Sequence, residues 1–361
     1  MSSTKRRIKV LYLYSGSRKD KFFGKIGVDY PDTQFYGFNH LAKFGVEAET
    51  REFNDLVGNP LVNKLFGFRL RHLFLCFYAR KYDIVFGSSI LYTAILKRFI
   101  CPKTKFILLN ISTARTIESN RKKHLKLKFI LWLLDEMDGV VCLSRSQIIF
   151  LKNIALQMAD RLFYVPLGVD TVFYQPNYTG RKDYLLSVGR DNGRDYKTVI
   201  DTARLMPRQK FQIVCSKRNL AGIKDIPGNV EIIYDLPIRE LKQKYLEAKA
   251  LLLITHEDKW SEGADCSGQT VLLDAMASGL PIITSRKKYL EDYAVDNKEA
   301  TFVDFYDPAK VKIAIESLNS VESRKEMTAR ARKRAEREFS TENMAKNLAT
   351  VFNSLSGNEN G

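Results

Sequence analysis

The sequence predicts an α/β protein with two doubly wound, Rossmann-like domains facing each other across a cleft. The chain has 361 residues, 45% of them apolar, which is enough for two domains of ordinary size. Short apolar runs without period-two alternation are separated by helix-like stretches, as in parallel sheets covered by helices on both faces. This rhythm stops over residues 168–183, which are rich in turn residues, and then restarts. We therefore expect two consecutive domains.

In the first half, five apolar runs predict strands, and residues 32–45 predict a helix. Gly45 stands where a helix C-cap favours glycine. The second half predicts six strands, with helices over residues 195–206 and 241–250 among those between them. Ligands of such sheets bind beyond the carboxyl ends of strands. The expected strands are residues 8–14, 82–89, 105–112, 139–144 and 162–168, then 183–189, 210–216, 229–235, 250–256, 281–285 and 300–305.

The charge of the chain is concentrated in its first half. The net charge is +17, and residues 1–175 hold 28 Lys and Arg against 14 Asp and Glu. A one-sided basic excess is typical of proteins that meet an anionic partner, which leaves a membrane, a nucleic acid or a charged polymer. The alternative is a basic domain that is merely well solvated.

The cysteines and the apolar runs bear on the compartment. Five scattered cysteines without metal-ligand spacing suit free thiols in a reducing compartment. The apolar run after the basic N-terminus spans about seven residues, too short for a signal peptide, and no window approaches the roughly 18 residues of a membrane span. We expect a cytoplasmic protein, with peripheral attachment to the inner face of a membrane left open.

The loop after residues 183–189 is the first candidate site. Gly189, Arg190, Arg194 and Lys197 lie before or early in a helix. A strand-to-helix turn offers unpaired N–H groups at a positive helix end, and cations beside it form charge-assisted bonds to phosphate. The alternative is a solvated loop in which the arginines bond Asp191 and Asp195.

The stretch "SEGADCSGQTVLLDAMASGLPIITS", residues 261–285, is the second candidate. A helix is expected to start near Gly268 to Thr270 and to stop at Gly279. Helical spacing places Thr270, Asp274 and Ser278 on one face, opposite apolar residues. A buried carboxylate needs partners, so either protein donors or ligand hydroxyls satisfy Asp274. Together the two candidates describe a site for a diphosphate and vicinal hydroxyls, as in a nucleotide sugar.

The order "LLSVGR", "NVEIIYDLPIRELKQKYLEAKALLLIT", "SGQTVLLDAMASGLPIITS" and "AEREFSTENMAKNLATVF" resembles the GT-B glycosyltransferases, specifically the large retaining group-1 (GT4-like) family. The stretches "DGVVCLSRSQIIFLKN" and "LFYVPLGVDTVFYQP" resemble the end of that family's N-terminal domain. The resemblance implies an acceptor-binding domain over residues 1–172 and a nucleotide-sugar-binding domain over residues 173–340. It also implies that residues 341–361 form a helix that packs back on the first domain, with a polar tail.

The resemblance implies retaining sugar transfer from a nucleoside diphosphate sugar without a metal or other cofactor, because cations and helix N-termini neutralise the leaving diphosphate. Arg190 matches the family's phosphate-binding arginine, and the following lysine falls on Arg194 by position or Lys197 by residue type. Asp274 matches the second of two glutamates and is implied to hold the ribose. Gly189 and the backbone of the helix start complete the implied donor site, the latter through Ser267, Gly268, Gln269 and Thr270.

Two positions depart from the family pattern. Cys266 stands where the first glutamate is expected, so Asp265 or Glu262 is left as the acid that reaches the donor sugar. The strand over residues 105–112 offers Asn110 and Ser112 in place of an expected histidine. These departures leave open a non-catalytic homologue that only binds a nucleotide sugar.

The acceptor side is predicted from the first half. Residues 120–134 carry five Lys and Arg followed by an apolar run with Trp132, as in interfacial membrane segments; residues 69–81 have a similar mixture, and core helices with charged ends are the alternative for both. Gly16, Gly24 and Gly27 in the loop after the first strand would let the backbone approach a ligand closely. The expected acceptor is a lipid-linked or cell-envelope glycan. Nucleic acid is the rival acceptor, disfavoured because no cations alternate with aromatics.

Overall fold

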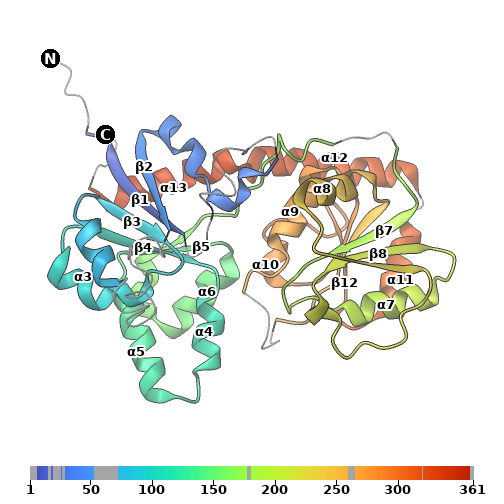
Figure 1. Ribbon diagram of the computed structural model, residues 1–361, viewed down its shortest axis with the longest axis horizontal. Helices are drawn as coiled ribbons and strands as arrows, with labels where there is room; N and C mark the ends of the chain where they lie inside the picture. Colours follow the sequence, from blue (N-terminus) through green and yellow to red (C-terminus); the bar gives the residue numbers. More distant parts are fainter. Residues whose placement is uncertain are drawn as a thin grey trace. The chain divides into compact units, whose positions relative to one another are not determined.

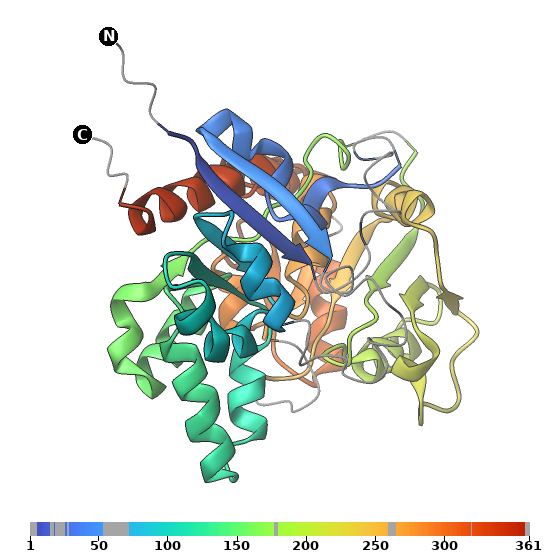
Figure 2. The same ribbon diagram turned by 60° about the vertical axis from the view of Figure 1, so that its left-hand side comes forward.

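A computed structural model of the chain describes residues 6–14, 18, 26, 29–52, 72–176, 180–258, 265–318 and 320–357. The chain forms two compact units (Figures 1 and 2). Unit 1 comprises Met1–Ile26, Gln34–Pro166 and Glu342–Gly361, and unit 2 comprises Gly27–Thr33 and Leu167–Thr341. The change from one unit to the other therefore falls after Pro166, a few residues before the expected boundary at 172.

Unit 1 contains a six-stranded sheet in the order β2-β1-β3-β4-β5-β6, and every pair of neighbouring strands is parallel. The apolar runs form these strands because both faces of the sheet are covered. Leu11 and Leu13 of β1 pack into one core, while the ring of Tyr12 on the opposite face meets Phe352. The strands are β1 Ile8–Tyr14, β2 Val46–Glu52, β3 Ile84–Gly87, β4 Lys105–Asn110, β5 Gly139–Cys142 and β6 Leu162–Tyr164.

The helices of unit 1 include short and long elements. Residues 72–79 are also helical. Phe352 of the last helix contacts the rings of Tyr12 and Phe86, so the C-terminal helix completes the core of unit 1. The helices are α3 Ala94–Ile100, α4 Thr113–Ser119, α5 His124–Asp135, α6 Arg145–Ile154 and α13 Thr341–Leu355, with 3₁₀ helices η1 Asp32–Phe35, η2 Phe38–Phe44, η4 Leu91–Thr93 and η5 Leu156–Arg161.

Two sequence predictions for unit 1 were wrong. Strand β2 was missed because it is a polar edge strand: Glu47, Glu49 and Arg51 are exposed in alternation, and we searched for apolar runs. The single α-helix expected over residues 32–45 is instead two 3₁₀ helices, interrupted at Tyr36 and Gly37, which both have positive φ. The expected cap holds, since Gly45 is left-handed and its N–H bonds the carbonyls of η2.

Unit 2 contains a second six-stranded parallel sheet, in the order β12-β11-β10-β7-β8-β9. The chain builds β7, β8 and β9 outward, then returns to place β10 beside β7. The order therefore reverses between β7 and β10, and such switch points are where open α/β sheets bind ligands. The six predicted strands are confirmed as β7 Tyr184–Val188, β8 Lys210–Cys215, β9 Val230–Tyr234, β10 Ala250–Leu253, β11 Ile282–Ser285 and β12 Thr301–Val303.

Helices cover both faces of this sheet. Figure 1 shows α7 and α11 on one side and α8, α9 and α12 on the other. The two parallel sheets with flanking helices confirm the predicted fold class of two Rossmann-like domains. The helices are α7 Tyr196–Leu205, α8 Ile238–Glu247, α9 Gln269–Ala277, α10 Lys288–Glu291, α11 Pro308–Ser317 and α12 Val321–Glu338, with the 3₁₀ helix η6 Lys217–Leu220.

Candidate functional site

The two candidate segments of the sequence meet at the switch point of unit 2. The segment 189–195 follows β7, residues 254–258 follow β10, and residues 286–287 follow β11. Because these three strands are parallel and adjacent, their carboxyl ends lie at one edge of the sheet. Helix α9 starts at the same edge, since Ser267 contacts the β7–α7 loop.

The β7–α7 loop is held by backbone and side-chain bonds. Asp195 N–H donates to Ile254 O at 3.1 Å, and His256 N–H donates to Gly193 O at 3.0 Å. The carboxylate of Asp195 caps α7 by accepting from Thr198 N–H. The loop is therefore a rigid part of the strand edge, which is what a preorganised site requires.

Arg194 is buried within this loop rather than presented to a ligand. Its Nε donates to Val188 O at 2.8 Å and its Nη1 to Ser267 Oγ at 3.1 Å, while Nη2 lies 3.3 Å from Asp191 Oδ2. The side chain is only 2% exposed. All three guanidinium nitrogens thus have protein partners, and the arginine joins the loop to the start of α9.

Asp191 is the counterion of this arrangement. It accepts from the Gly193 N–H at 2.9 Å and from the Ser267 hydroxyl. Burial alone would raise the pKa of Asp191, but Arg194, the Ser267 hydroxyl and the Gly193 N–H together hold it below its ordinary value. The ion pair therefore joins a buried guanidinium to a half-buried carboxylate whose oxygens have further hydrogen-bond donors.

Two glycines make this packing possible. A Cβ on Gly189 would lie 2.1 Å from Nε of Arg194, and one on Gly193 would lie 2.4 Å from Oγ of Ser267. Any side chain at either position would displace Arg194 or Ser267. Gly189, predicted as part of the donor site, thus lies directly against Arg194.

The other two predicted cations are exposed. Arg190 has a side chain 58% exposed and lies 3.7 Å from Asp235, which is itself on the surface. Lys197 points along α7, where its Nζ pairs with Asp201 at 2.6 Å. Arg190 follows directly on the buried Gly189 at the strand edge, whereas the structure shows Lys197 engaged within its own helix.

Helix α9 has the bounds that the sequence predicts. Gly268 is the left-handed N-cap, with φ of 96°, and a left-handed glycine at 279 follows the last turn. Thr270 is exposed, while the other residues of Gln269–Ala277 are buried. In a helix the side chain of residue i+4 leans back towards residue i, so the carboxyl of Asp274 lies beneath the surface position of Thr270.

Asp274 is the most perturbed acid of the site. It is 5% exposed, and its Oδ1 has no hydrogen-bond partner. Burial raises the pKa of Asp274 well above its ordinary value, a hydrogen bond with Tyr174 partly opposes this, and Asp170 adds to it. A strongly perturbed, buried acid on a helix that begins at the ligand-binding edge of the sheet marks a functional-site candidate.

Other buried polar atoms in unit 2 also lack partners. Both amide atoms of Gln269, the hydroxyl of Ser278 on α9 and the hydroxyl of Thr255 after β10 are buried without a hydrogen bond. Such groups are costly in a finished protein interior. Of these, Gln269 at the start of α9 and Thr255 after β10 lie at the carboxyl edge of the sheet, where a ligand with polar groups would relieve them.

The acid predicted to reach the donor sugar is only partly described. Asp265 is half-buried directly before Cys266, and Glu262 lies outside the described residues. Burial raises the pKa of the Cys266 thiol to about 12, with Asp265 and Asp191 adding to the effect. Cys266 is therefore neutral and supplies no charge where the family pattern has a carboxylate.

Sequence reasoning missed Lys287 and Tyr289. Lys287 is 5% exposed and lies 3.7 Å from Asp258, and its pKa is lowered by burial, with Asp258 opposing the shift. Tyr289 donates its hydroxyl hydrogen to Ser267 O at 2.5 Å. The available signal was the run Arg286-Lys287-Lys288 directly after a predicted strand, which offers a cation at the same sheet edge.

The corresponding edge of unit 1 is different in kind. The sheet order reverses between β1 and β3. A small hollow there is lined by aromatic and aliphatic residues, and Arg18 lies over the rings of Tyr14 and Tyr36 at 4.4 and 5.4 Å. Gly16, Gly24 and Gly27, which the sequence places in the loop after β1, lie outside the described residues.

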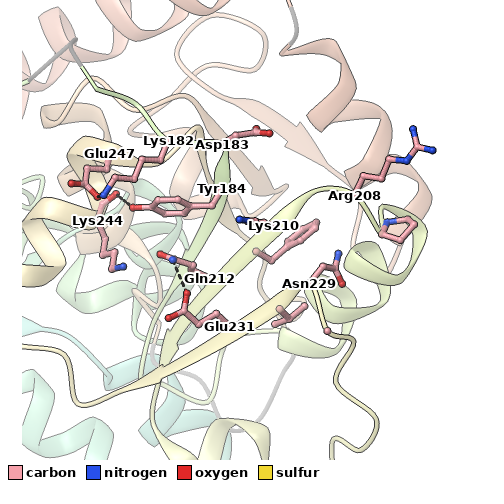
Figure 3. Close-up of a pocket in the computed structure, with 14 residues that line it drawn as sticks. Lys182, Asp183, Tyr184, Arg208, Lys210, Gln212, Asn229, Glu231, Lys244 and Glu247 are labelled. Carbon is pink, nitrogen blue, oxygen red and sulfur yellow. Dashed lines mark hydrogen bonds and ion pairs between the residues drawn. The ribbon is translucent and has the colours of Figure 1, made fainter.

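A larger hollow of about 860 Å³ lies at the amino ends of β7, β8 and β9 (Figure 3). Two of its acidic side chains have partners: Glu247 bonds Lys182 at 2.7 Å, and Glu231 accepts from Gln212 at 2.7 Å. It lies at the end of the sheet opposite the switch-point loops. Ligands of open α/β sheets bind at the carboxyl ends, so we place the candidate site at the switch point.

No cluster of three or more His, Cys, Asp and Glu side chains in the described part of the chain has the arrangement of a metal site. Among the helices that the structure describes, none combines the length and the apolar character that crossing a bilayer requires.

Comparison with known proteins bears first on unit 2. Residues 194–350 match a family model described as "Glycosyl transferase-like". The match begins at the buried Arg194 and includes α9. The chain therefore carries a glycosyltransferase-like domain. No curated protein matches the chain in sequence.

Solved structures match almost the entire chain at low identity. Sucrose-phosphate synthase from Thermosynechococcus elongatus is 15% identical with a TM-score of 0.74, covering 98% of this chain and 100% of its own. Anabaena HepE in complex with UDP-glucose is 11% identical with a TM-score of 0.68, covering 96% and 100%. The lipopolysaccharide outer core galactosyltransferase WaaB is 16% identical with a TM-score of 0.62, covering 96% and 99%. The fold is that of the GT-B glycosyltransferases.

Proposed function

We propose that the protein transfers a sugar from a nucleoside diphosphate sugar to a glycan or lipid-linked acceptor, with retention at the anomeric carbon and without a metal. The glycosyltransferase-like match over residues 194–350 supports the reaction class. The observation that carries the donor site is Asp274, a buried acid with an unpartnered oxygen one turn below the exposed Thr270. A ribose offers the vicinal hydroxyls that would satisfy it.

The diphosphate would lie at the start of α9. First-turn N–H groups of a helix lack intrahelical partners and favour anions. Arg190 is the exposed cation of the neighbouring loop and supplies charge-assisted bonds. Arg194 acts as a positioning residue, because its nitrogens are bonded to Val188, Ser267 and Asp191. In this arrangement the loop and helix stabilise the charge that develops on the leaving diphosphate.

Lys287 adds a second buried cation beside Asp258 at the same edge. A cation that is held dry acts more strongly on a nearby charge than one in water. We assign it to the outer phosphate or to the transferred sugar. Asp265 and Glu262 remain the candidate acids for contact with that sugar, because the neutral thiol of Cys266 cannot serve.

The neutral Cys266 favours one alternative, a homologue that binds a nucleotide sugar without transferring it. Among the described residues of unit 2, no feature favours nucleic acid as the acceptor. Uridine is the first base to test, because the Anabaena neighbour was solved with UDP-glucose.

The test is a thermal-shift screen with UDP-, GDP- and ADP-sugars, followed by turnover assays with the donor that binds. We expect one nucleotide family to raise the melting temperature and the matching sugar to be released or transferred. Retention is checked by NMR of the anomeric configuration of the product. Binding without any turnover would favour the non-catalytic homologue, and absence of binding to all donors would overturn the proposal.

A further inference from the structure

Helices α4 and α5 form a hairpin that extends from the sheet of unit 1, with residues 120–123 at its tip (Figures 1 and 2). Only α5 has a long buried face: Ile130, Leu133 and Leu134 pack into the core of unit 1. That burial explains why half of the helix is apolar. That burial does not account for the apolar residues on the opposite face of α5.

The opposite face of α5 is an exposed apolar stripe. Leu125 is 87% exposed, Phe129 41% and Trp132 45%. Their spacing of four and then three residues puts them on one side of the helix. The rings of Phe129 and Trp132 stack on each other with centroids 5.9 Å apart. Exposed apolar residues that are contiguous, rather than scattered, mark interaction surfaces.

Cations surround the start of this stripe. Arg121, Lys122, Lys123, Lys126 and Lys128 are all exposed. Arg121 pairs with Glu118 at 3.5 Å, whereas the four lysines form no ion pair within the part of the chain that the structure describes. The tip of the hairpin therefore carries net positive charge that no described protein group neutralises.

We propose that α5 and the tip residues 120–123 dock on the surface of an anionic lipid bilayer. Leu125, Phe129 and Trp132 enter the boundary between headgroups and acyl chains, and the lysines meet lipid phosphates. Tryptophan beside lysine is favoured at that depth. A nucleic acid fits less well, because the two rings stack on each other instead of offering open faces to bases.

This proposal concerns unit 1 and stands independently of the sugar transfer proposed for unit 2. If both hold, docking brings the protein to the surface where a lipid-linked acceptor lies. The two are tested separately, because nucleotide-sugar binding measured by thermal shift is expected to be unchanged in every variant of the hairpin.

The first experiment measures flotation of the full chain with vesicles of phosphatidylcholine and phosphatidylglycerol in equal parts, against phosphatidylcholine alone. We expect binding to the anionic vesicles that falls as salt is raised. The variant Lys122→Glu/Lys123→Glu/Lys126→Glu is expected to lose at least about 100-fold in partition coefficient, because each cation near an anionic surface contributes about fivefold. The matched control, Lys298→Glu/Lys325→Glu/Lys333→Glu, reverses three exposed lysines of unit 2 and should retain most of the binding.

The second experiment tests insertion of the stripe. The chain has two tryptophans, Trp132 and Trp260, so a Trp260→Phe background isolates Trp132, whose emission should shift to the blue on anionic vesicles. In the wild-type background Phe129→Ala/Trp132→Ala should weaken binding about 10-fold or more, since each ring loses its buried apolar area. Ile313→Ala, at a residue 64% exposed on α11, is the matched control.

Four outcomes would overturn the proposal. These are equal binding to neutral and anionic vesicles, an equal loss in the control variants, unchanged Trp132 emission, and displacement from vesicles by inorganic phosphate at constant ionic strength. Retention of duplex DNA by the same three lysines, with DNA competing against vesicles, would assign the surface to nucleic acid instead. Thermal melts of all variants establish that they remain folded.

Discussion

The carboxyl ends of the two sheets have the same topology and opposite chemistry. In unit 1 the switch point between β1 and β3 holds Tyr14 and Tyr36 with Arg18 stacked on them. In unit 2 the switch point between β7 and β10 holds a buried ion pair and unpartnered polar atoms. Topology thus selects where a ligand can sit, and the residues after each strand select which ligand. The charged edge is the one to which we assign the diphosphate of the proposed donor.

The largest effect is expected from breaking the ion pair of unit 2. Arg194→Met should lower the free energy of unfolding by about 2–4 kcal/mol, because it removes the buried guanidinium that bonds Val188 and Ser267 and leaves the half-buried Asp191 without its counterion. Urea unfolding measures this, and Arg190→Met on the exposed part of the same loop should change stability by no more than about 0.5 kcal/mol. The double variant Arg194→Met/Asp191→Asn should recover part of the loss. Equal losses in the single and double variants would show that the charge of Asp191 is not what Arg194 compensates.

The second effect concerns the pH dependence that Asp274 imposes. The pKa of Asp274 is raised in the folded state. The stability that the protonated side chain contributes is therefore fully present below the unfolded pKa of about 3.9, and it is lost as pH rises towards the folded-state pKa. Asp274→Asn lacks this loss. The free energy of unfolding of the variant should rise relative to that of the wild type by about 1.4 kcal/mol per pH unit across this pH range. The affinity of the variant for a nucleotide should fall. Parallel stability curves from pH 3 to 8 would contradict this expectation.

Binding of a nucleotide should also draw a proton from Asp274, because ribose hydroxyls that donate to it favour the ionised form. Calorimetric titrations in buffers of different ionisation enthalpy report the proton released. The release should disappear in Asp274→Asn, which provides the control. An equal proton release in both proteins would assign it to another group.

A smaller effect separates two exposed cations, Arg190 on the β7–α7 loop and Lys197 on α7. Arg190→Ala should weaken binding of a nucleoside diphosphate by about 10-fold, the scale of one charge-assisted hydrogen bond, and leave binding of the nucleoside alone unchanged. Lys197→Ala, at a residue paired with Asp201, is the matched comparison. If Lys197→Ala shows the larger loss, the phosphate-binding role passes to the lysine.

The smallest effect is expected at the aromatic edge. Arg18→Ala should lower the free energy of unfolding by no more than about 1 kcal/mol, because a cation over an accessible ring contributes about 0.5–1 kcal/mol to stability. Nucleotide affinity should stay unchanged if the two edges bind different ligands. A loss of nucleotide affinity in Arg18→Ala would contradict the expectation that the two sheet edges bind different ligands.

Several elements of the fold could be predicted because their signals are local. The strands of unit 2 are mostly apolar runs, and α9 is bounded by Gly268 and Gly279, both left-handed. Strand β2 escaped because an edge strand needs few apolar residues. The interrupted helix over residues 32–45 escaped because Tyr36 adopts a positive φ, which no pattern of apolar residues reveals.

The candidate site was predicted less completely than the fold. The chain order of Arg190, Arg194 and Lys197 says nothing about which of them is buried, because burial follows from the glycines at 189 and 193 that admit Arg194. Lys287 arrives from a strand about 90 residues away in sequence and meets the loop only through the sheet order. That these residues meet depends on the order of the strands in the sheet, which no single sequence motif reveals.

The placement of α13 has a consequence for biosynthesis. Phe352 closes the aromatic core around Tyr12 and Phe86, and backbone or side-chain atoms of Ala345 and Leu355 lie against Gly37 and Gly139. Unit 1 therefore cannot complete its core until α13 has left the ribosome, although domains generally fold from the N-terminus during synthesis. Unit 1 is thus synthesised first but completes its core last. A nascent chain stalled before α13 exposes an apolar face of unit 1, which chaperones would recognise.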